Sequence, residues 1–148
     1  MRRRLWFLFL VVVLAATVAW LSMRAKERVV SQGALYAYRG NIYESLFREP
    51  YETLIFIMED GTFFGFTTQE DNWVRGAPGF TVEYLQKSGY GPGKIRVCIH
   101  NHFDPSGFSD DDKRLYRRLR DGELKGQFGI YYPATGKCRW MPDEEKSK

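Results

Sequence analysis

Residues 95–119 read IRVCIHNHFDPSGFSDDDKRLYRRL and contain the clearest secondary-structure pattern of the chain. Its apolar start, 95–99, predicts a buried strand. Ser109 has the side chain of a helix N-cap, and the three aspartates after it suit the first turn of a helix. That helix, over 110–120, would carry its apolar residues on one side, at Leu115, Tyr116 and Leu119. A strand, a short loop and an amphipathic helix in succession predict a fold in which helices and strands form packed layers.

The segments on either side continue this alternation. Apolar runs at 53–58 and 62–67, separated by a turn signal, predict a β-hairpin. Residues 29–39 are expected to form an exposed connection into the fold. Two further strands are expected, at 127–132 and 137–141. Two short helices are expected, at 41–48 and 81–87. The sequence therefore predicts a fold of the α/β (α+β) class.

The length and the charge of the chain limit the classes of function that it can have. A chain of 148 residues has room for one domain of ordinary size. The net charge of +4 is unevenly spread, because residues 1–28 carry +5 and the remaining 120 residues carry −1. The domain over 29–148 therefore lacks the basic surface that nucleic-acid binding requires, and no nucleic-acid partner is expected.

The N-terminal segment 1–28 contains 18 consecutive uncharged residues, LWFLFLVVVLAATVAWLS at 5–22. As a helix this run would be about 27 Å long, close to the apolar thickness of a bilayer. Three arginines precede it at 2–4, which favours a cytoplasmic N-terminus and a domain on the non-cytoplasmic side, although basic residues at 24–28 weaken this orientation. We therefore expect a single transmembrane anchor. The alternative is a cleaved signal peptide, with secretion of the domain.

Export would place the two cysteines, Cys98 and Cys138, in an oxidising compartment. They could pair there, but the sequence leaves open whether they meet.

The two histidines of the chain, His100 and His102, stand two residues apart at the end of the strand expected over 95–99. Residues i and i+2 of an extended chain point to the same side, so both imidazoles are aimed at one place. Imidazole suits zinc, which usually takes three protein ligands and a water at catalytic sites. An aspartate at 110–112 could supply an anionic third ligand. The alternative is that Ser-x-x-Asp at 109–112 is only a helix-capping motif.

The stretch IHNHFDPSGFSDDDKRL resembles the signature of the JAB/MPN (JAMM) metallopeptidase domains, which is His-x-His, a short loop and Ser-x-x-Asp. The resemblance implies a curved mixed β-sheet flanked by helices, with a cytidine-deaminase-like architecture. It also implies one zinc ion with His100, His102 and Asp112 as ligands. Ser109 would donate a hydrogen bond to the tetrahedral intermediate. Phe103 stands where the family usually has proline, and the loop before Ser109 is one residue shorter than usual.

The resemblance further implies an upstream glutamate as general base. Glu52 stands directly before the expected strand at 53–58 and is the preferred candidate. Glu49 is the alternative, and Glu44 is a more distant third. The expected function is therefore a membrane-anchored zinc metallopeptidase that hydrolyses a peptide or isopeptide bond of a protein or peptide substrate. The alternative is a non-catalytic protein-binding module of the same fold, held at the membrane.

Overall fold

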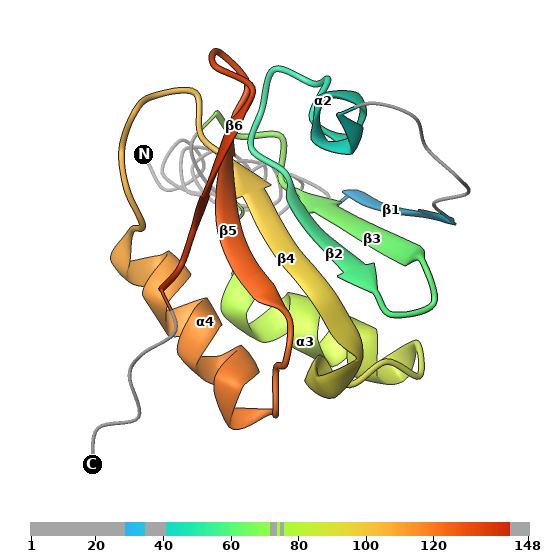
Figure 1. Ribbon diagram of the computed structural model, residues 1–148. Helices are drawn as coiled ribbons and strands as arrows, with labels where there is room; N and C mark the ends of the chain where they lie inside the picture. The colour runs from blue at the N-terminus through green and yellow to red at the C-terminus, as the bar shows by residue number, and fades with distance from the viewer. Residues whose placement is uncertain (1–28, 35–40, 72–73, 75, 143–148) are drawn as a thin grey trace, which may run out of the picture.

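The computed structural model describes residues 29–34, 41–71, 74 and 76–142. These residues form one six-stranded mixed sheet in the order β1-β3-β2-β4-β5-β6, with three α-helices (Figure 1). The strands are β1 Val29–Ala34, β2 Leu54–Met58, β3 Thr62–Thr67, β4 Ile95–Asn101, β5 Gln127–Tyr132 and β6 Lys137–Trp140. The helices are α2 Ile42–Leu46, α3 Ala77–Lys87 and α4 Asp110–Asp121, with a 3₁₀ turn at Pro92–Lys94. The mixed α+β class expected from the sequence is confirmed.

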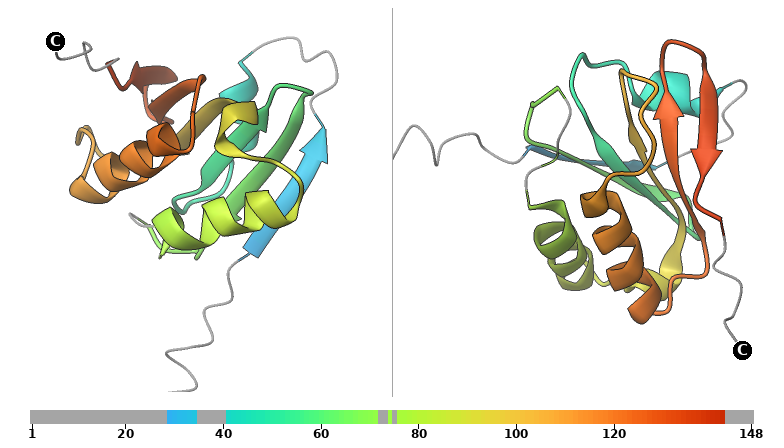
Figure 2. Two further views of the ribbon diagram at one scale, coloured as in Figure 1. Left: turned by 90° about the horizontal axis from the view of Figure 1, so that it is seen from below. Right: turned by 90° about the vertical axis from the view of Figure 1, so that its left-hand side faces the viewer.

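Both faces of the sheet are covered, which explains why the central strands are apolar throughout. All five residues of β2 are buried. Because alternate side chains of a strand point to opposite faces, Phe56 packs with the cluster under α3 and α4, whereas Ile55 and Ile57 pack with the cluster that includes Phe47 after α2. Figure 2 shows α3 and α4 side by side on one face of the sheet.

The one parallel pairing in this sheet positions the loop that carries the histidines. β4 pairs with β5 in parallel, whereas each of the other strand pairs is antiparallel. Parallel neighbours require a crossover, and α4 supplies it. The loop 102–109 therefore turns the chain back from the end of β4, and the first turn of α4 lies near the end of that strand (Figure 1).

Most expected elements are present within a few residues of their predicted bounds, including the hairpin β2–β3. The prediction of an exposed connection over 29–39 is wrong for its first part, because Val29–Ala34 forms β1 and pairs antiparallel with β3. The helix expected at 81–87 begins earlier, at Ala77. Pro78 stands at its second position, where proline is tolerated because the missing N–H would have no helical acceptor.

The cysteines do not pair. Cys98 and Cys138 are both free, and β5 lies between their strands β4 and β6. Cys98 belongs to the cluster under α3 and α4, while Cys138 packs against the cluster on the opposite face of the sheet.

Within the described ranges, no helix combines the length and the apolar character needed to cross a bilayer. The anchor expected over 1–28 lies outside those ranges.

Candidate functional site

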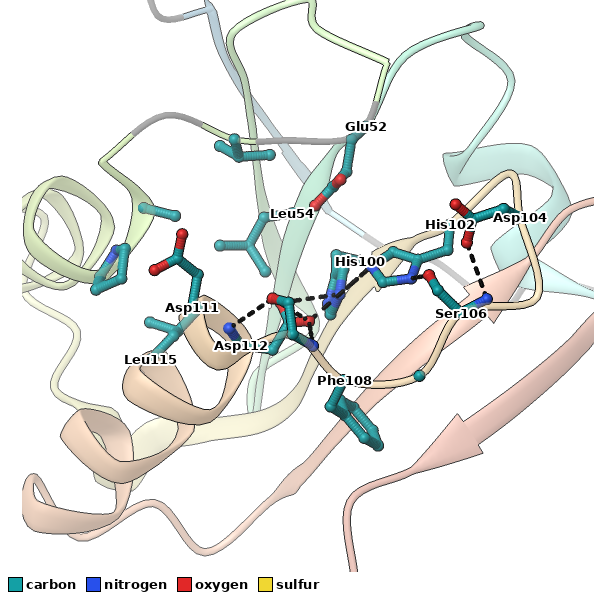
Figure 3. A pocket seen from close by; sticks show the side chains of 15 residues that line it. Glu52, Leu54, His100, His102, Asp104, Ser106, Phe108, Asp111, Asp112 and Leu115 are labelled. Carbon is teal, nitrogen blue, oxygen red and sulfur yellow. Dashed lines mark hydrogen bonds and ion pairs between the residues drawn. The ribbon is translucent and has the colours of Figure 1, made fainter.

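A cavity of about 640 Å³ opens at the end of β4, between the start of β2, the loop 102–109 and the first turns of α3 and α4 (Figure 3). Its lining includes Glu52, His100, His102, Ser109 and Asp112. Every site residue preferred from the sequence thus lines one cavity. Glu44 and Glu49, the alternatives to Glu52, are exposed and do not line it.

Strand register explains why Glu52 reaches the histidines. β2 and β4 pair antiparallel, with Leu54 opposite His100. Continued by two residues, this register brings Glu52 opposite His102. Residues two apart on a strand share a face, so the carboxylate and the two rings point to the same side of the sheet.

Asn101, between the two histidines, fixes the backbone around Glu52. Its side chain is fully buried. The amide oxygen accepts a 2.8 Å hydrogen bond from the backbone N–H of Thr53, and the amide nitrogen donates to the carbonyl of Tyr51 at 3.3 Å. The Glu52 carbonyl accepts a 2.8 Å hydrogen bond from Thr67 Oγ1. Both neighbours of Glu52 are therefore held by Asn101, a role that the sequence pattern did not predict.

The two rings and the aspartate converge at distances that suit a metal ion. His100 Nε2 lies 3.1 Å from His102 Nε2 and 3.1 Å from Asp112 Oδ1. His102 Nε2 lies 4.0 Å from Asp112 Oδ2. Ligands at about 2.0–2.1 Å from a tetrahedral zinc ion are about 3.3 Å apart. Both 3.1 Å separations are close to this value, whereas the 4.0 Å separation involves the other oxygen of Asp112.

Asp112 contacts His100 and also caps helix α4. Its backbone N–H donates to Ser109 Oγ at 3.1 Å, and its Oδ2 accepts from the Ser109 backbone N–H at 2.7 Å and from Ser109 Oγ at 2.8 Å. Oδ1 is left to face His100. Burial raises the pKa of the Asp112 carboxyl, but the hydrogen bond and charge of His100, with the Ser109 hydrogen bonds, lower it below its usual value. The capping motif and the metal-binding arrangement are therefore compatible.

Glu52 is the most unusual carboxyl of the cavity. It is 6% exposed, and its Oε2 has no hydrogen-bond partner within the described part of the chain. Burial raises the pKa of Glu52 to about 7, against the lowering effect of His100. One Glu52 oxygen and one nitrogen from each histidine lie within 4.8 Å of one another, so these three side chains could hold a metal ion.

His102 is oriented by the loop that follows it. Its Nδ1 lies 2.9 Å from Ser106 Oγ. Ser106 is itself fixed, because its N–H donates to Asp104 Oδ1 at 2.8 Å and its carbonyl accepts from Tyr132 Oη at 2.6 Å. Burial, followed by the charge of His100, lowers the pKa of His102, so the ring stays neutral as a metal ligand must. A proton on Nδ1, donated to Ser106, leaves the Nε2 lone pair directed at the cluster.

The raised pKa of Glu52 predicts a pH-dependent stability of the metal-free chain. A glutamate ionises at about 4.5 when unfolded and at about 7 in this fold, so ionisation destabilises the folded state progressively between these values. We expect Glu52→Gln to remove a penalty that approaches about 3 kcal/mol above pH 7 and is absent below pH 4.5. Urea unfolding of both proteins in a chelator across this range would measure the difference. A difference that does not grow with pH would contradict the prediction.

Comparison of the chain with models of protein families, with curated proteins and with solved structures finds no match in any of the three.

Proposed function

We propose that the protein is a zinc-dependent metallopeptidase of the JAB/MPN type, which hydrolyses a peptide or isopeptide bond. The observation that carries this proposal is the convergence of three donor atoms on the cavity side of the sheet. His100 Nε2 lies 3.1 Å from both His102 Nε2 and Asp112 Oδ1. Two neutral rings and one carboxylate are a donor set that zinc accepts at catalytic sites, where a water takes the remaining position. The proposal includes the cytidine-deaminase-like arrangement of the sheet and its helices.

Glu52 acts as the general base in this proposal, rather than as a ligand. A zinc ion bound to His100, His102 and Asp112 would acidify a water and polarise the scissile carbonyl. Glu52 would accept the proton of that water through Oε2, which has no hydrogen-bond partner in the described part of the chain, and would deliver it to the leaving amine. Burial raises the pKa of Glu52 to about 7 in the metal-free chain, and the charge of a bound zinc ion would lower it.

Ser109 supplies a donor for the developing oxyanion. Its hydroxyl points at Asp112 Oδ2 in this structure, and the adjacent backbone N–H bonds the same oxygen at 2.7 Å. The hydroxyl can therefore turn toward a substrate while the backbone N–H keeps Asp112 in place. A donor of this kind typically contributes about 10²–10³ to turnover.

The location of the protein belongs to the proposal as well. The apolar residues 5–22 support a single membrane anchor with the domain on the non-cytoplasmic side, or secretion after cleavage. The substrate would then be an exported protein or peptide.

The direct test is metal-dependent hydrolysis by the purified full chain. We expect a library of fluorescence-quenched peptides to be cleaved by the zinc-loaded chain, to be left intact after treatment with a chelator, and to be cleaved again when zinc is restored. A folded chain that takes up zinc but cleaves no member of the library would favour the non-catalytic binding module. A folded chain that takes up no zinc would end the proposal.

Ser106 provides a test of how the ligands are oriented. Replacing Ser106 with alanine removes the oxygen that lies 2.9 Å from His102 Nδ1, so the ring loses its fixed orientation. We expect zinc affinity to fall by about 10–100-fold, as is typical when the hydrogen-bond partner of a ligating histidine is lost. Competition with a chromophoric chelator would measure this affinity. Ser106→Thr keeps the hydroxyl and should retain most of the affinity, and an unchanged affinity in Ser106→Ala would contradict the assigned role.

A further inference from the structure

One wall of the cavity is apolar. Leu54 of β2 and Leu115 of α4 contribute to this wall, together with Val74 and the first residues of α3, Ala77 and Pro78. Figure 3 shows the side chains of Leu54 and Leu115 near that of Asp111, which stands in the first turn of α4. A carboxylate at the margin of an apolar wall is complementary to a side chain with a long aliphatic stem and a cationic end.

The charged residues that line the cavity outside the proposed zinc position are acidic. The carboxylates of the cavity come from Glu52, Asp104, Asp111 and Asp112, and none of its described lining residues is a lysine or arginine. Besides the surface acids, the lining includes Glu52, which is 6% exposed and whose Oε2 has no hydrogen-bond partner among the described residues. Asp112 and Glu52 would face the zinc ion and offset its charge, which leaves Asp104 and Asp111 to attract cationic groups.

Asp111 is available to a ligand although it already has a partner. Its Oδ1 pairs with Arg114 three residues later on α4, and the two side chains are 41% and 63% exposed. An exposed pair of this kind contributes little free energy, so a cation that approaches from the cavity can replace Arg114 at low cost.

We propose that this region is a substrate subsite for a lysine or arginine side chain next to the scissile bond. The methylene groups of that side chain lie along Leu54, Pro78 and Leu115, and its cationic end pairs with Asp111. This inference rests on the proposed peptidase function, whose substrate class it specifies.

Matched peptides test the subsite in the zinc-loaded full chain. Each position beside the scissile bond is occupied in turn by lysine, by norleucine, which is uncharged and of similar length, or by glutamate. We expect kcat/KM at one position to follow the order lysine, norleucine, glutamate, with at least about a threefold preference for lysine over norleucine. Asp111→Asn should remove that preference, and Asp111→Lys should reverse the order in favour of glutamate.

Asp110→Asn is the control for the helix. Asp110 is the neighbouring first-turn acid, its side chain is 93% exposed, and it does not line the cavity. The variant removes the same charge from the same helix end, so it should keep the preference for lysine. Equal kcat/KM for lysine and norleucine peptides at every position, or a preference that survives in Asp111→Asn, would overturn the subsite and leave the proposed function intact.

A binding measurement separates the inference from catalysis. Titration of the zinc-loaded chain with N-acetyl-lysine amide and with N-acetyl-norleucine amide would be followed by the NMR shifts of the Asp111 and Leu115 backbone amides. We expect the lysine compound to bind at least about threefold more tightly. The same preference in a chain that hydrolyses no peptide would overturn the peptidase function and retain the subsite. Equal binding of the two compounds would overturn the subsite.

Discussion

Replacing His100 with alanine should reduce the zinc content of the purified chain from one equivalent to near zero and abolish hydrolysis. His100 is the centre of the cluster, since its Nε2 lies 3.1 Å from both His102 Nε2 and Asp112 Oδ1. Without it, one ring and one carboxylate of the proposed ligand set remain, which is fewer than the three protein ligands typical of catalytic zinc. Elemental analysis after dialysis against buffered zinc measures the loss.

The control for His100→Ala must lose buried volume without losing a ligand. Leu54 lies opposite His100 in the sheet and is 2% exposed, as His100 is. Leu54→Ala should therefore be destabilised by about 2–5 kcal/mol and still bind one equivalent of zinc. Retention of a full equivalent by folded His100→Ala would show that the ring is not a ligand.

Replacing Glu52 with glutamine should lower kcat by about 10²–10⁴-fold while leaving one equivalent of zinc bound. Glutamine preserves the shape of the buried side chain, but it cannot accept the proton of the attacking water. Peptide hydrolysis and zinc affinity, measured on the same preparation, separate the loss of a base from the loss of a ligand.

Glu49→Gln is the matched control, because Glu49 lies three residues earlier, is exposed and does not line the cavity. It should retain full activity. Loss of zinc in Glu52→Gln would instead assign Glu52 as a ligand beside His100 and His102, whose donor atoms lie within 4.8 Å of its carboxylate. Full activity in Glu52→Gln would exclude it as the base.

Local patterns predicted the elements that carry the site. The apolar run at 95–99 and the acidic start of α4 each depend on neighbours in sequence, and the structure contains both as β4 Ile95–Asn101 and α4 Asp110–Asp121. β1 was missed because its stability as a strand comes from pairing with β3, more than 25 residues later in the chain. An edge strand of this kind leaves a weak local signal.

Features of the site that depend on non-local contacts could not be derived from sequence. The family resemblance already favoured Glu52 over Glu49, but the burial of Glu52 beside the histidines follows from the register of β2 against β4. The contact of Ser106 with His102 depends on the path of one loop, which Tyr132 holds from the next strand. The position of Asn101 was informative in the sequence. Its two neighbouring side chains share one face of the strand, so the polar side chain between them must point to the opposite face.

Anomalous scattering from crystals of the zinc-loaded chain, measured at the zinc edge, tests the proposed metal centre most directly. We expect one strong peak about 2.0–2.2 Å from His100 Nε2, His102 Nε2 and a carboxylate oxygen of Asp112, with Glu52 beside it but not bound. The absence of a peak at the two rings, or a zinc ion there that Asp112 does not ligate, would contradict the proposed metal centre.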